Sequence, residues 1–493
     1  MAAVKTVDLS CSYGSRQVLK RVNLEVDPGE AVAITGRSGS GKTTLAYCLT
    51  GIIPYRVRAE VSGRIYVDGI DAEKSGFEEL VKHVNIVLED YEAQIFGLTV
   101  EEDIVFGLEN IGLSPDEVSR RLEWAVSVAG LKDKRKAPVS SLSGGQKQRL
   151  AITSTVVLKP KVLILDNPTS NLDWSGVKQL SRLVRTLKAD GCAVILMLRK
   201  LKGVEDSVDR IYRLEDGELK GIERYVEALS VLVRKTHTIR RRRPLAEVRN
   251  IWFTYGDEYV LKSVSLEVYG GEVLAVMGCN GSGKTTLMKL ISGLLKPVRG
   301  SVTICGRDTR QLSASETARL VGLAFQDPSK HLFAETVWDE VSFTCRILGL
   351  PLENAERAIR MLRLEGVRDR PTYRLSMGER VRTVIASALA QDPEILLLDE
   401  PTTGQDEELL VELADIIGRV KADGKAVVVV THDTDFALAV ADRVVVLSGG
   451  RVIRDGPVEK ILRDPGVVEE AGLEPPSTRA EVMDGVSMRA CSG

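Results

Sequence analysis

Short runs of branched apolar residues alternate along this chain with longer stretches in which apolar and polar positions follow a helical period. Four of these runs lie at residues 31–35, 162–165, 395–398 and 426–430. Runs of this length and composition are typical of strands buried on both faces of a sheet. Their alternation with amphipathic helices predicts an α/β fold built around a mainly parallel sheet.

The whole pattern is present twice. Residues 11–45 return in closely similar form at residues 253–287, and the later motifs keep the same order. A chain of 493 residues is also longer than one compact core usually holds. We therefore predict two homologous domains at residues 1–225 and 245–475, a basic linker at 226–244 and a loosely ordered tail at 476–493.

The charge balance is nearly even, with 67 Lys and Arg against 69 Asp and Glu. No basic field over the whole protein indicates nucleic acid, and no nucleic-acid partner is expected. The longest basic run, Arg240 to Arg243, is most simply a solvated part of the linker. A local contact with acidic lipid or nucleic acid is the alternative.

Cysteine usage and hydropathy indicate the redox compartment of the protein and its relation to a membrane. Seven scattered cysteines form no CxxC pair, which argues against zinc sites, iron–sulfur clusters and a disulfide framework and favours a reducing compartment. No apolar run approaches the ~18–20 residues needed to cross a bilayer, and the first residues do not resemble a signal peptide. A role at a membrane would therefore depend on partners.

Two glycine-rich loops each follow a strand and open a helix, and both match the pattern GxxxxGK[ST]. Glycine amides and the helix N-terminus attract phosphate, the lysine reaches the β- and γ-phosphate oxygens, and the threonine hydroxyl ligates Mg²⁺. The sequence therefore predicts two ATP sites. Their nucleotide-binding residues are Gly36, Ser38, Gly39, Ser40, Gly41, Lys42, Thr43 and Thr44 in the first loop, and Gly278, Asn280, Gly281, Ser282, Gly283, Lys284, Thr285 and Thr286 in the second.

An aspartate ends an apolar strand in each half, at Asp166 and Asp399. A carboxylate in that place after a phosphate loop can orient Mg²⁺, so both aspartates are predicted metal residues together with Thr43 and Thr285. Glu400 stands next to Asp399, where its carboxylate could polarise an attacking water.

Further motifs make nearly the whole chain similar to the ABC ATPase family. Residues 142–146 read LSGGQ, the signature of that family, and the resemblance implies two P-loop domains, each with a mainly parallel core sheet, an antiparallel β subdomain and a helical subdomain. It implies head-to-tail pairing, with each ATP held between the phosphate loop of one domain and the signature of the other. The resemblance implies adenine stacking for Tyr13 and Tyr255, and γ-phosphate binding for Ser143, Gly144, Gly145 and Gln146. It also implies that Gln326 is the Q-loop glutamine, which faces the metal, that Glu400 is the catalytic carboxylate and that His432 is the switch histidine. Ser143 is further expected to cap a helix, whereas both tyrosines could instead be core aromatics.

The two halves differ at the positions that carry chemistry. Glu89, Asn167 and Arg199 stand in the first half where the second has Gln326, Glu400 and His432. The second signature reads LSMGE, in which Met377 adds a side chain where close backbone approach is wanted and Glu379 adds negative charge near a phosphate. In a head-to-tail pair all these changes fall in one site. We predict one hydrolytic site and one that holds ATP but turns it over slowly, with decay of a redundant site as the alternative.

Residues 89–113 and 326–350 are similar to the ATPases of energy-coupling-factor importers, which take up vitamins and transition-metal ions. The matching residues in the first half are Gln94, Ile95, Phe96, Glu102, Phe106 and Gly107, whereas the second half departs at His331 and at Thr344 and Cys345, which follow Phe343. The resemblance implies two integral membrane partners, a coupling protein and a substrate-binding protein, and a peripheral position on the cytoplasmic side of the membrane. Ile95, Phe96, Leu332 and Phe333 could line the groove that receives the partner's helices, or could be buried within each domain.

Three other functions fit parts of the sequence. A tandem sugar-importer ATPase has a similar length and asymmetry, but the energy-coupling-factor-like stretches argue against it. A soluble tandem ABC protein acting on ribosomes or DNA usually carries a charged helical linker, a zinc or iron–sulfur segment or coiled coils, none of which is visible in the sequence. A regulatory nucleotide-binding module is the third. The sequence does not name the transported substrate.

Overall fold

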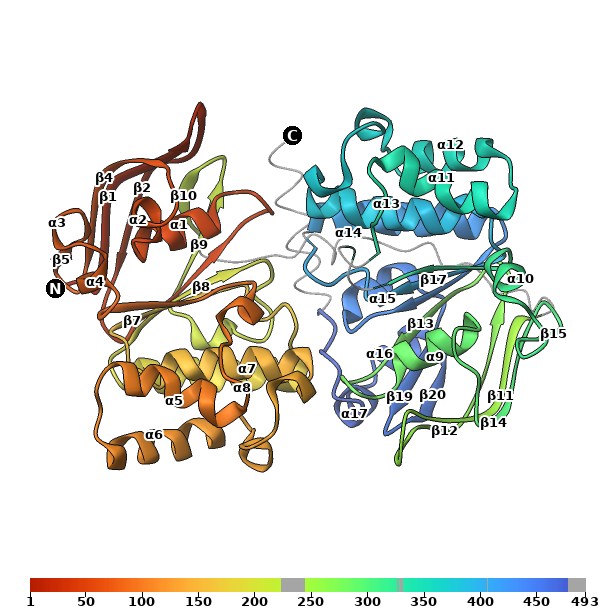
Figure 1. Ribbon diagram of the computed structural model, residues 1–493, viewed down its shortest axis with the longest axis horizontal. Helices are drawn as coiled ribbons and strands as arrows, with labels where there is room; N and C mark the ends of the chain where they lie inside the picture. The colour runs from red at the N-terminus through yellow and green to blue at the C-terminus, as the bar shows by residue number, and fades with distance from the viewer. Residues whose placement is uncertain (223–243, 326–327, 329–330, 406, 478–493) are drawn as a thin grey trace. The chain divides into compact units, whose positions relative to one another are not determined.

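The computed structural model describes residues 1–222, 244–325, 328, 331–405 and 407–477. The chain divides into two compact units, Met1–Tyr225 and Val226–Gly493 (Figure 1). Gln326, the run Arg240 to Arg243 and nearly all of the predicted tail lie outside the described residues. Within the described part of the chain, no helix is both long and apolar enough to cross a membrane.

The first unit contains two sheets. An antiparallel sheet has the order β2-β1-β4-β5, and a six-stranded sheet has the order β10-β9-β3-β8-β7-β6, in which only the β9–β10 pair is antiparallel. The strands are β1 (Val4–Tyr13), β2 (Arg16–Val26), β3 (Ala31–Thr35), β4 (Glu60–Val67), β5 (Ile70–Asp71), β6 (Val84–Val87), β7 (Val162–Asp166), β8 (Ala193–Leu198), β9 (Arg210–Glu215) and β10 (Glu218–Ile222). Every residue of β3, β7 and β8 is buried, as their continuous apolar sequences predict.

The second unit repeats this plan. Its antiparallel sheet has the order β12-β11-β14-β15 and its mainly parallel sheet the order β16-β17-β18-β13-β19-β20. The strands are β11 (Pro244–Thr254), β12 (Tyr259–Tyr269), β13 (Val273–Met277), β14 (Arg299–Ile304), β15 (Arg307–Asp308), β16 (Val321–Ala324), β17 (Ile395–Asp399), β18 (Ala426–Val430), β19 (Arg443–Ser448) and β20 (Arg451–Pro457). The four strands predicted from sequence are β3, β7, β17 and β18, so the predicted α/β class and mainly parallel core are confirmed.

Helices cover the parallel sheet and build a separate helical layer in each unit. In the first unit these are α1 (Lys42–Leu49), α2 (Ile52–Tyr55), α3 (Ala72–Ser75), α4 (Phe77–Leu80), α5 (Val100–Asn110), α6 (Pro115–Val128), α7 (Gly144–Val156) and α8 (Trp174–Ala189). In the second they are α9 (Lys284–Ile291), α10 (Ala314–Ala318), α11 (Val337–Leu348), α12 (Leu352–Met361), α13 (Met377–Ala390), α14 (Glu407–Ala422), α15 (Thr434–Val440), α16 (Val458–Leu462) and α17 (Pro465–Glu470). Figure 1 shows α5, α6 and α7 grouped in one unit and α11, α12 and α13 in the other.

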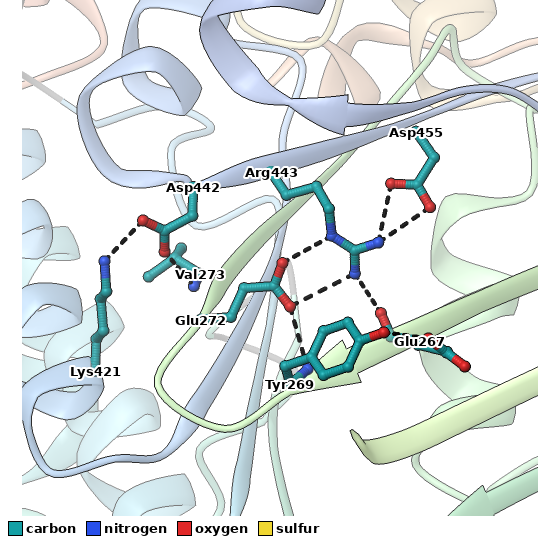
Figure 2. A network of polar contacts seen from close by, with 8 residues as sticks. All are labelled: Glu267, Tyr269, Glu272, Val273, Lys421, Asp442, Arg443 and Asp455. Atoms are coloured by element: carbon teal, nitrogen blue, oxygen red, sulfur yellow. Dashed lines mark hydrogen bonds and ion pairs between the residues drawn. The ribbon is translucent and has the colours of Figure 1, made fainter. Parts of the chain in front are cut away.

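A network of buried charges fixes the start of β13, the strand that leads into the second phosphate loop (Figure 2). The Nε of Arg443 donates to Glu272 at 2.7 Å, and Glu272 is only 1% exposed. The backbone amide of Val273 donates to Asp442 at 2.8 Å, and the Nζ of Lys421 donates to the other oxygen of Asp442 at 2.8 Å. We call Glu272, Arg443, Asp442 and Lys421 the β13 bracket. It joins β13 to the end of β12, because Glu272 also accepts the amide of Tyr269.

The first unit has the same arrangement at the start of β3. Arg210 pairs with Glu30, the amide of Ala31 donates to Asp209 at 2.8 Å, and Lys188 lies 2.7 Å from the same carboxylate. We call Glu30, Arg210, Asp209 and Lys188 the β3 bracket. The repeat therefore preserves the charged framework of the fold, although it changes several site residues.

Candidate nucleotide sites

The first phosphate loop connects β3 to α1 and needs its glycines for close packing. Gly36 has a φ of 156°, and a Cβ atom there would lie 2.4 Å from the carbonyl oxygen of Leu214. The Nζ of Lys42 donates to the carbonyls of Gly36 at 2.6 Å and of Arg37 at 3.0 Å, so the amine sits over the loop. The hydroxyl of Ser40 is buried, with no hydrogen-bond partner in the described part of the chain. These positive and unsatisfied groups fit a bound phosphate.

The second loop, between β13 and α9, has the same geometry. Gly278 has a φ of 149°, and a Cβ atom there would lie 2.2 Å from the carbonyl oxygen of Leu447. Lys284 donates to the carbonyls of Gly278 at 2.7 Å and Cys279 at 3.1 Å. The buried hydroxyl of Ser282 again has no partner among the described residues. The two loops are therefore folded alike, whatever differs around them.

Each predicted metal aspartate lies beside the threonine of its phosphate loop. Thr43 donates to Asp166 at 2.7 Å, and the other oxygen of Asp166 is buried without a partner in the described residues. Thr285 donates to Asp399 at 3.3 Å. Burial outweighs the Thr285 hydrogen bond and raises the pKa of Asp399 to about 6. A buried, incompletely satisfied carboxylate next to a hydroxyl fits a hard cation such as Mg²⁺.

Glu400 and His432 come together in the second unit. Glu400 follows β17 with a φ of 48°, and its side chain is 8% exposed. Its Oε2 lies 2.9 Å from the Nδ1 of His432, and its Oε1 lies 3.9 Å from the Nζ of Lys284. Burial alone would raise the pKa of Glu400, but the imidazole outweighs burial and lowers it. The carboxylate is thus held ionised, as a group that accepts a proton from water must be.

The first unit places different groups at these positions. Asn167 follows β7 with the same φ of 48°, a left-handed conformation that asparagine adopts more readily than glutamate. Arg199, after β8, donates to Glu89, after β6, at 2.6 Å. Two of the three replaced positions therefore form an ion pair that the sequence did not reveal.

A cavity of about 400 Å³ in the first unit is lined by all three replaced residues, Glu89, Asn167 and Arg199. Its lining also includes Tyr13, Lys42, Thr43 and Thr44. Sequence reasoning missed two lining residues, Arg16 and Val18, of which Arg16 is charged. The signal was available in the repeat, because the residue aligned with Arg16 in the second half is Glu258.

The first signature opens α7 with the predicted cap. The hydroxyl of Ser143 accepts the amide of Gln146 at 3.4 Å, and the side chain of Gln146 accepts the amide of Ser143 at 3.0 Å. Gly144 is exposed, and a Cβ atom there would meet only the Tyr91 hydroxyl, at 3.3 Å. The fold of the first unit does not crowd this glycine, so its small size leaves the helix N-terminus open to a ligand.

The altered signature opens α13 with an equivalent cap at Ser376. Met377 occupies the first helical position and is 47% exposed. The carboxylate of Glu379 accepts the amide of Ser376 at 2.8 Å and lies 3.0 Å from Arg370. Burial alone would raise the pKa of Glu379, but the contacts with Ser376 and Arg370 lower it. Part of our expectation therefore changes, since Glu379 caps its own helix and its charge is paired with Arg370.

Both predicted adenine-stacking tyrosines lie at the surface. Tyr13 is 37% exposed with its hydroxyl 3.5 Å from that of Thr44, and Tyr255 is 62% exposed with its hydroxyl 3.4 Å from that of Thr286. Neither is a core aromatic, so the alternative interpretation was wrong. Both rings are available beside a phosphate-loop helix.

The family model for the ABC transporter matches residues 19–170 and 261–403, which together contain both phosphate loops and both signatures. The chain belongs to the ABC transporter family. It is a tandem ATP-binding protein of that family and hence an ATPase.

Provisionally named ABC transporter ATP-binding proteins match this chain over nearly its whole length. One from Methanosarcina mazei is 33% identical over 95% of this chain and 98% of its own. One from Staphylococcus aureus is 30% identical over 94% and 92%. Among solved structures, cbiO1 from Clostridium perfringens, described as part of the ABC transporter complex cbiONQ, is 30% identical over 46% of this chain and 94% of its own, with a TM-score of 0.43.

The residues that resemble energy-coupling-factor ATPases divide between core and surface in this ABC protein. Ile95 and Leu332 pack against the hydrophobic cores of their units. Phe96 is 70% exposed and packs on Phe106, with ring centroids 6.0 Å apart. Phe333 is 66% exposed and packs edge-on against Phe343 at 4.6 Å. The phenylalanines therefore lie mainly at the surface, whereas Ile95 and Leu332 are half-buried.

The remaining residues of these stretches have structural partners. Gln94 accepts the amide of Leu88 and donates to the carbonyl of Ile86, which holds the segment against β6. Glu102 completes the capping box of α5, and Gly107 passes close to Leu158. In the second unit, the ring of His331 lies 5.8 Å from that of Phe325, and Cys345 is fully buried and donates to the carbonyl of Ala390. Thr344 is half-buried.

Proposed function

We propose that this tandem ATPase energises a membrane importer for a vitamin or a transition-metal ion. The observation that carries the proposal is the exposed pair of aromatic rings at equivalent places in the two units, Phe96 on Phe106 and Phe333 on Phe343. Large apolar side chains exposed together commonly mark a binding surface. In this proposal they receive helices of the coupling protein, which binds the substrate-binding membrane protein, and the ATPase lies on the cytoplasmic side of the membrane.

The second unit supplies the hydrolytic chemistry in this proposal. Lys284 binds the β- and γ-phosphates, and Thr285 and Asp399 would hold Mg²⁺, which would supply charge neutralisation at the phosphates. Glu400 polarises the attacking water, and His432 keeps the carboxylate ionised and in place. Gln326 completes this set by its place in the sequence.

The first unit binds ATP without rapid hydrolysis in this proposal. Lys42, Thr43 and Asp166 keep the binding geometry, whereas Asn167 cannot accept a proton and Arg199 is always charged. We infer that the two units pair head to tail, as the family resemblance implies. Met377 then faces the first phosphate loop, and Ser143 with its two glycines faces the second.

Capture of partners from membranes tests this function. Full-length Glu400→Gln protein loaded with ATP would be incubated with detergent-solubilised native membranes and recovered, and the proteins and small molecules bound to it would be identified. A polytopic membrane protein together with a small integral substrate-binding protein is the expected result. Recovery of ribosomal particles or nucleic acid without membrane protein would refute it, and a periplasmic-type sugar importer would favour the sugar alternative.

Matched surface variants connect the result to the aromatic pairs. Phe96→Ser and Phe333→Ser should lose the membrane partner yet still bind ATP, because neither ring lies in a phosphate loop. Leu294→Ser is the control, since Leu294 is 60% exposed at a different place in the second unit. Equal partner loss in all three variants would show that the aromatic pairs have no special part in docking.

A further inference from the structure

The cavity of the first unit has more positive than negative side chains in its lining. Arg16, Lys42 and Arg199 all line it, and Glu89 is the one acidic residue in the lining. The residues aligned with Arg16 and Arg199 in the second half are Glu258 and His432. The first site is therefore more positive than the second at both positions.

Arg199 and Glu89 lie on either side of the strand end that carries Asp166. Arg199 follows β8 and Glu89 follows β6, and β7 lies between these strands in the sheet. Burial is the main reason that the pKa of Asp166 is raised, but Glu89 raises it further while Lys42 and Arg199 oppose the rise. All four charges thus act on one small region, where the phosphates of a nucleotide would lie.

The two side chains of the Arg199–Glu89 ion pair differ in their exposure to solvent. The side chain of Arg199 is 16% exposed and that of Glu89 is 43% exposed. The carboxylate can therefore turn to solvent at little cost, whereas the guanidinium stays in the cavity wall. A guanidinium is permanently charged and binds phosphate oxygens in a fork, so it can hold a phosphate but cannot relay a proton as a histidine can.

We propose that Arg199 makes the first site selective for nucleoside triphosphate over diphosphate, with Glu89 as a counterion that the terminal phosphate displaces. The proposal rests on the proposed function, in which this site retains nucleotide without hydrolysing it. Without nucleotide, Glu89 neutralises the buried guanidinium. When ATP binds, its terminal phosphate takes the place of the carboxylate, and Glu89 returns to water. ADP lacks this phosphate and leaves the pair intact.

The test measures binding of radiolabelled ATP and ADP to the full chain by equilibrium dialysis with Mg²⁺. A Lys284→Ala background removes the second phosphate-loop lysine, so that the first site dominates. Arg199→Ala should weaken ATP binding about 10- to 100-fold, the usual effect of losing a charge-assisted contact, and leave ADP binding nearly unchanged. Arg199→Lys should restore part of the preference, and Glu89→Gln should strengthen ATP binding because no carboxylate competes for Arg199.

Arg16→Ala is the matched control, because Arg16 lines the same cavity but is not part of the Arg199–Glu89 ion pair. It should weaken ATP and ADP binding by similar factors. Equal losses for ATP and ADP in Arg199→Ala, or no loss, would overturn the proposed selectivity. If the Lys284→Ala protein bound neither ATP nor ADP, with or without the added Lys42→Ala change, the proposed function of the first unit would be refuted instead. Thermal unfolding of each variant shows that a loss of binding is not a loss of fold.

Discussion

Replacing Asp399 with asparagine is expected to stabilise the nucleotide-free protein above about pH 6, although it removes a proposed metal residue. Asp399 is 3% exposed, and burial raises its pKa from 3.8 to about 6. Because the folded state holds the proton more tightly than the unfolded chain, the protonated form contributes stability below pH 4, and this contribution is lost as the pH rises through 6. Asparagine is neutral throughout and can still accept from Thr285.

The size of the effect follows from the change in pKa. A shift from 3.8 to about 6 corresponds to about 3 kcal/mol at a pH above both values. For a unit of this size that amounts to roughly 6–12 °C in the unfolding midpoint. The difference between variant and wild type should disappear at about pH 4, where both carry a neutral side chain at this position.

Scanning calorimetry without nucleotide or Mg²⁺, at about pH 4, 6 and 8, measures this difference. Hydrogen exchange of peptides from β17 assigns the affected transition to the second unit. Asp166→Asn in the first unit is the matched control and should act in the same direction, since burial also raises the pKa of Asp166. An Asp399→Asn protein less stable than wild type at about pH 8, or equally shifted at about pH 4, would refute the reasoning. With ATP and Mg²⁺ the order should reverse in the second unit, because the variant has lost a proposed metal residue and gains less ligand stabilisation there.

Three further experiments test other parts of the structure. Glu400→Gln should lower ATP turnover by ~10²–10⁴-fold and Asn167→Ala far less, because only Glu400 can act as a base; equal losses in steady-state assays would contradict the asymmetry. Arg443→Gln should cost the second unit about 3–5 kcal/mol in urea unfolding by leaving the buried carboxylate of Glu272 without its charged partner. Arg210→Gln should cost the first unit less, because the Glu30–Arg210 pair is more exposed, at 14% and 44%, and the opposite order would be inconsistent with the two brackets. Ser143→Ala should cost about 1 kcal/mol and speed hydrogen exchange at the start of α7 alone, and unchanged exchange there would mean that the cap contributes little.

Local patterns gave most of the fold. The apolar runs at 31–35, 162–165, 395–398 and 426–430 became β3, β7, β17 and β18, because runs this short and rich in branched residues favour a strand that is buried on both faces of a sheet. The phosphate loops and the cap at Ser143 were predictable because their geometry depends on residues that are neighbours in sequence.

Contacts between distant residues were not predictable in this way. Glu89 and Arg199 are 110 positions apart, and nothing near either residue indicates that they meet. The separation of Ile95 from Phe96 also came only from the structure, since both are apolar and a turn decides which faces inward. The partner that Glu379 finds in Arg370 belongs to the same class.

The central strands of the two units have a mechanical consequence. Strand β13 begins at the β13 bracket and ends at the second phosphate loop, and its five residues span about 17 Å. It is hydrogen-bonded along both sides, to β18 and β19, so it can shift along its length only if those strands move with it. A displacement of the second phosphate loop is therefore transmitted along β13 to the β13 bracket at its other end, and from there to β12. Strand β3 is built in the same way, between β8 and β9, so a displacement of the first phosphate loop would be transmitted to the β3 bracket even though this half has Asn167 in the place of Glu400.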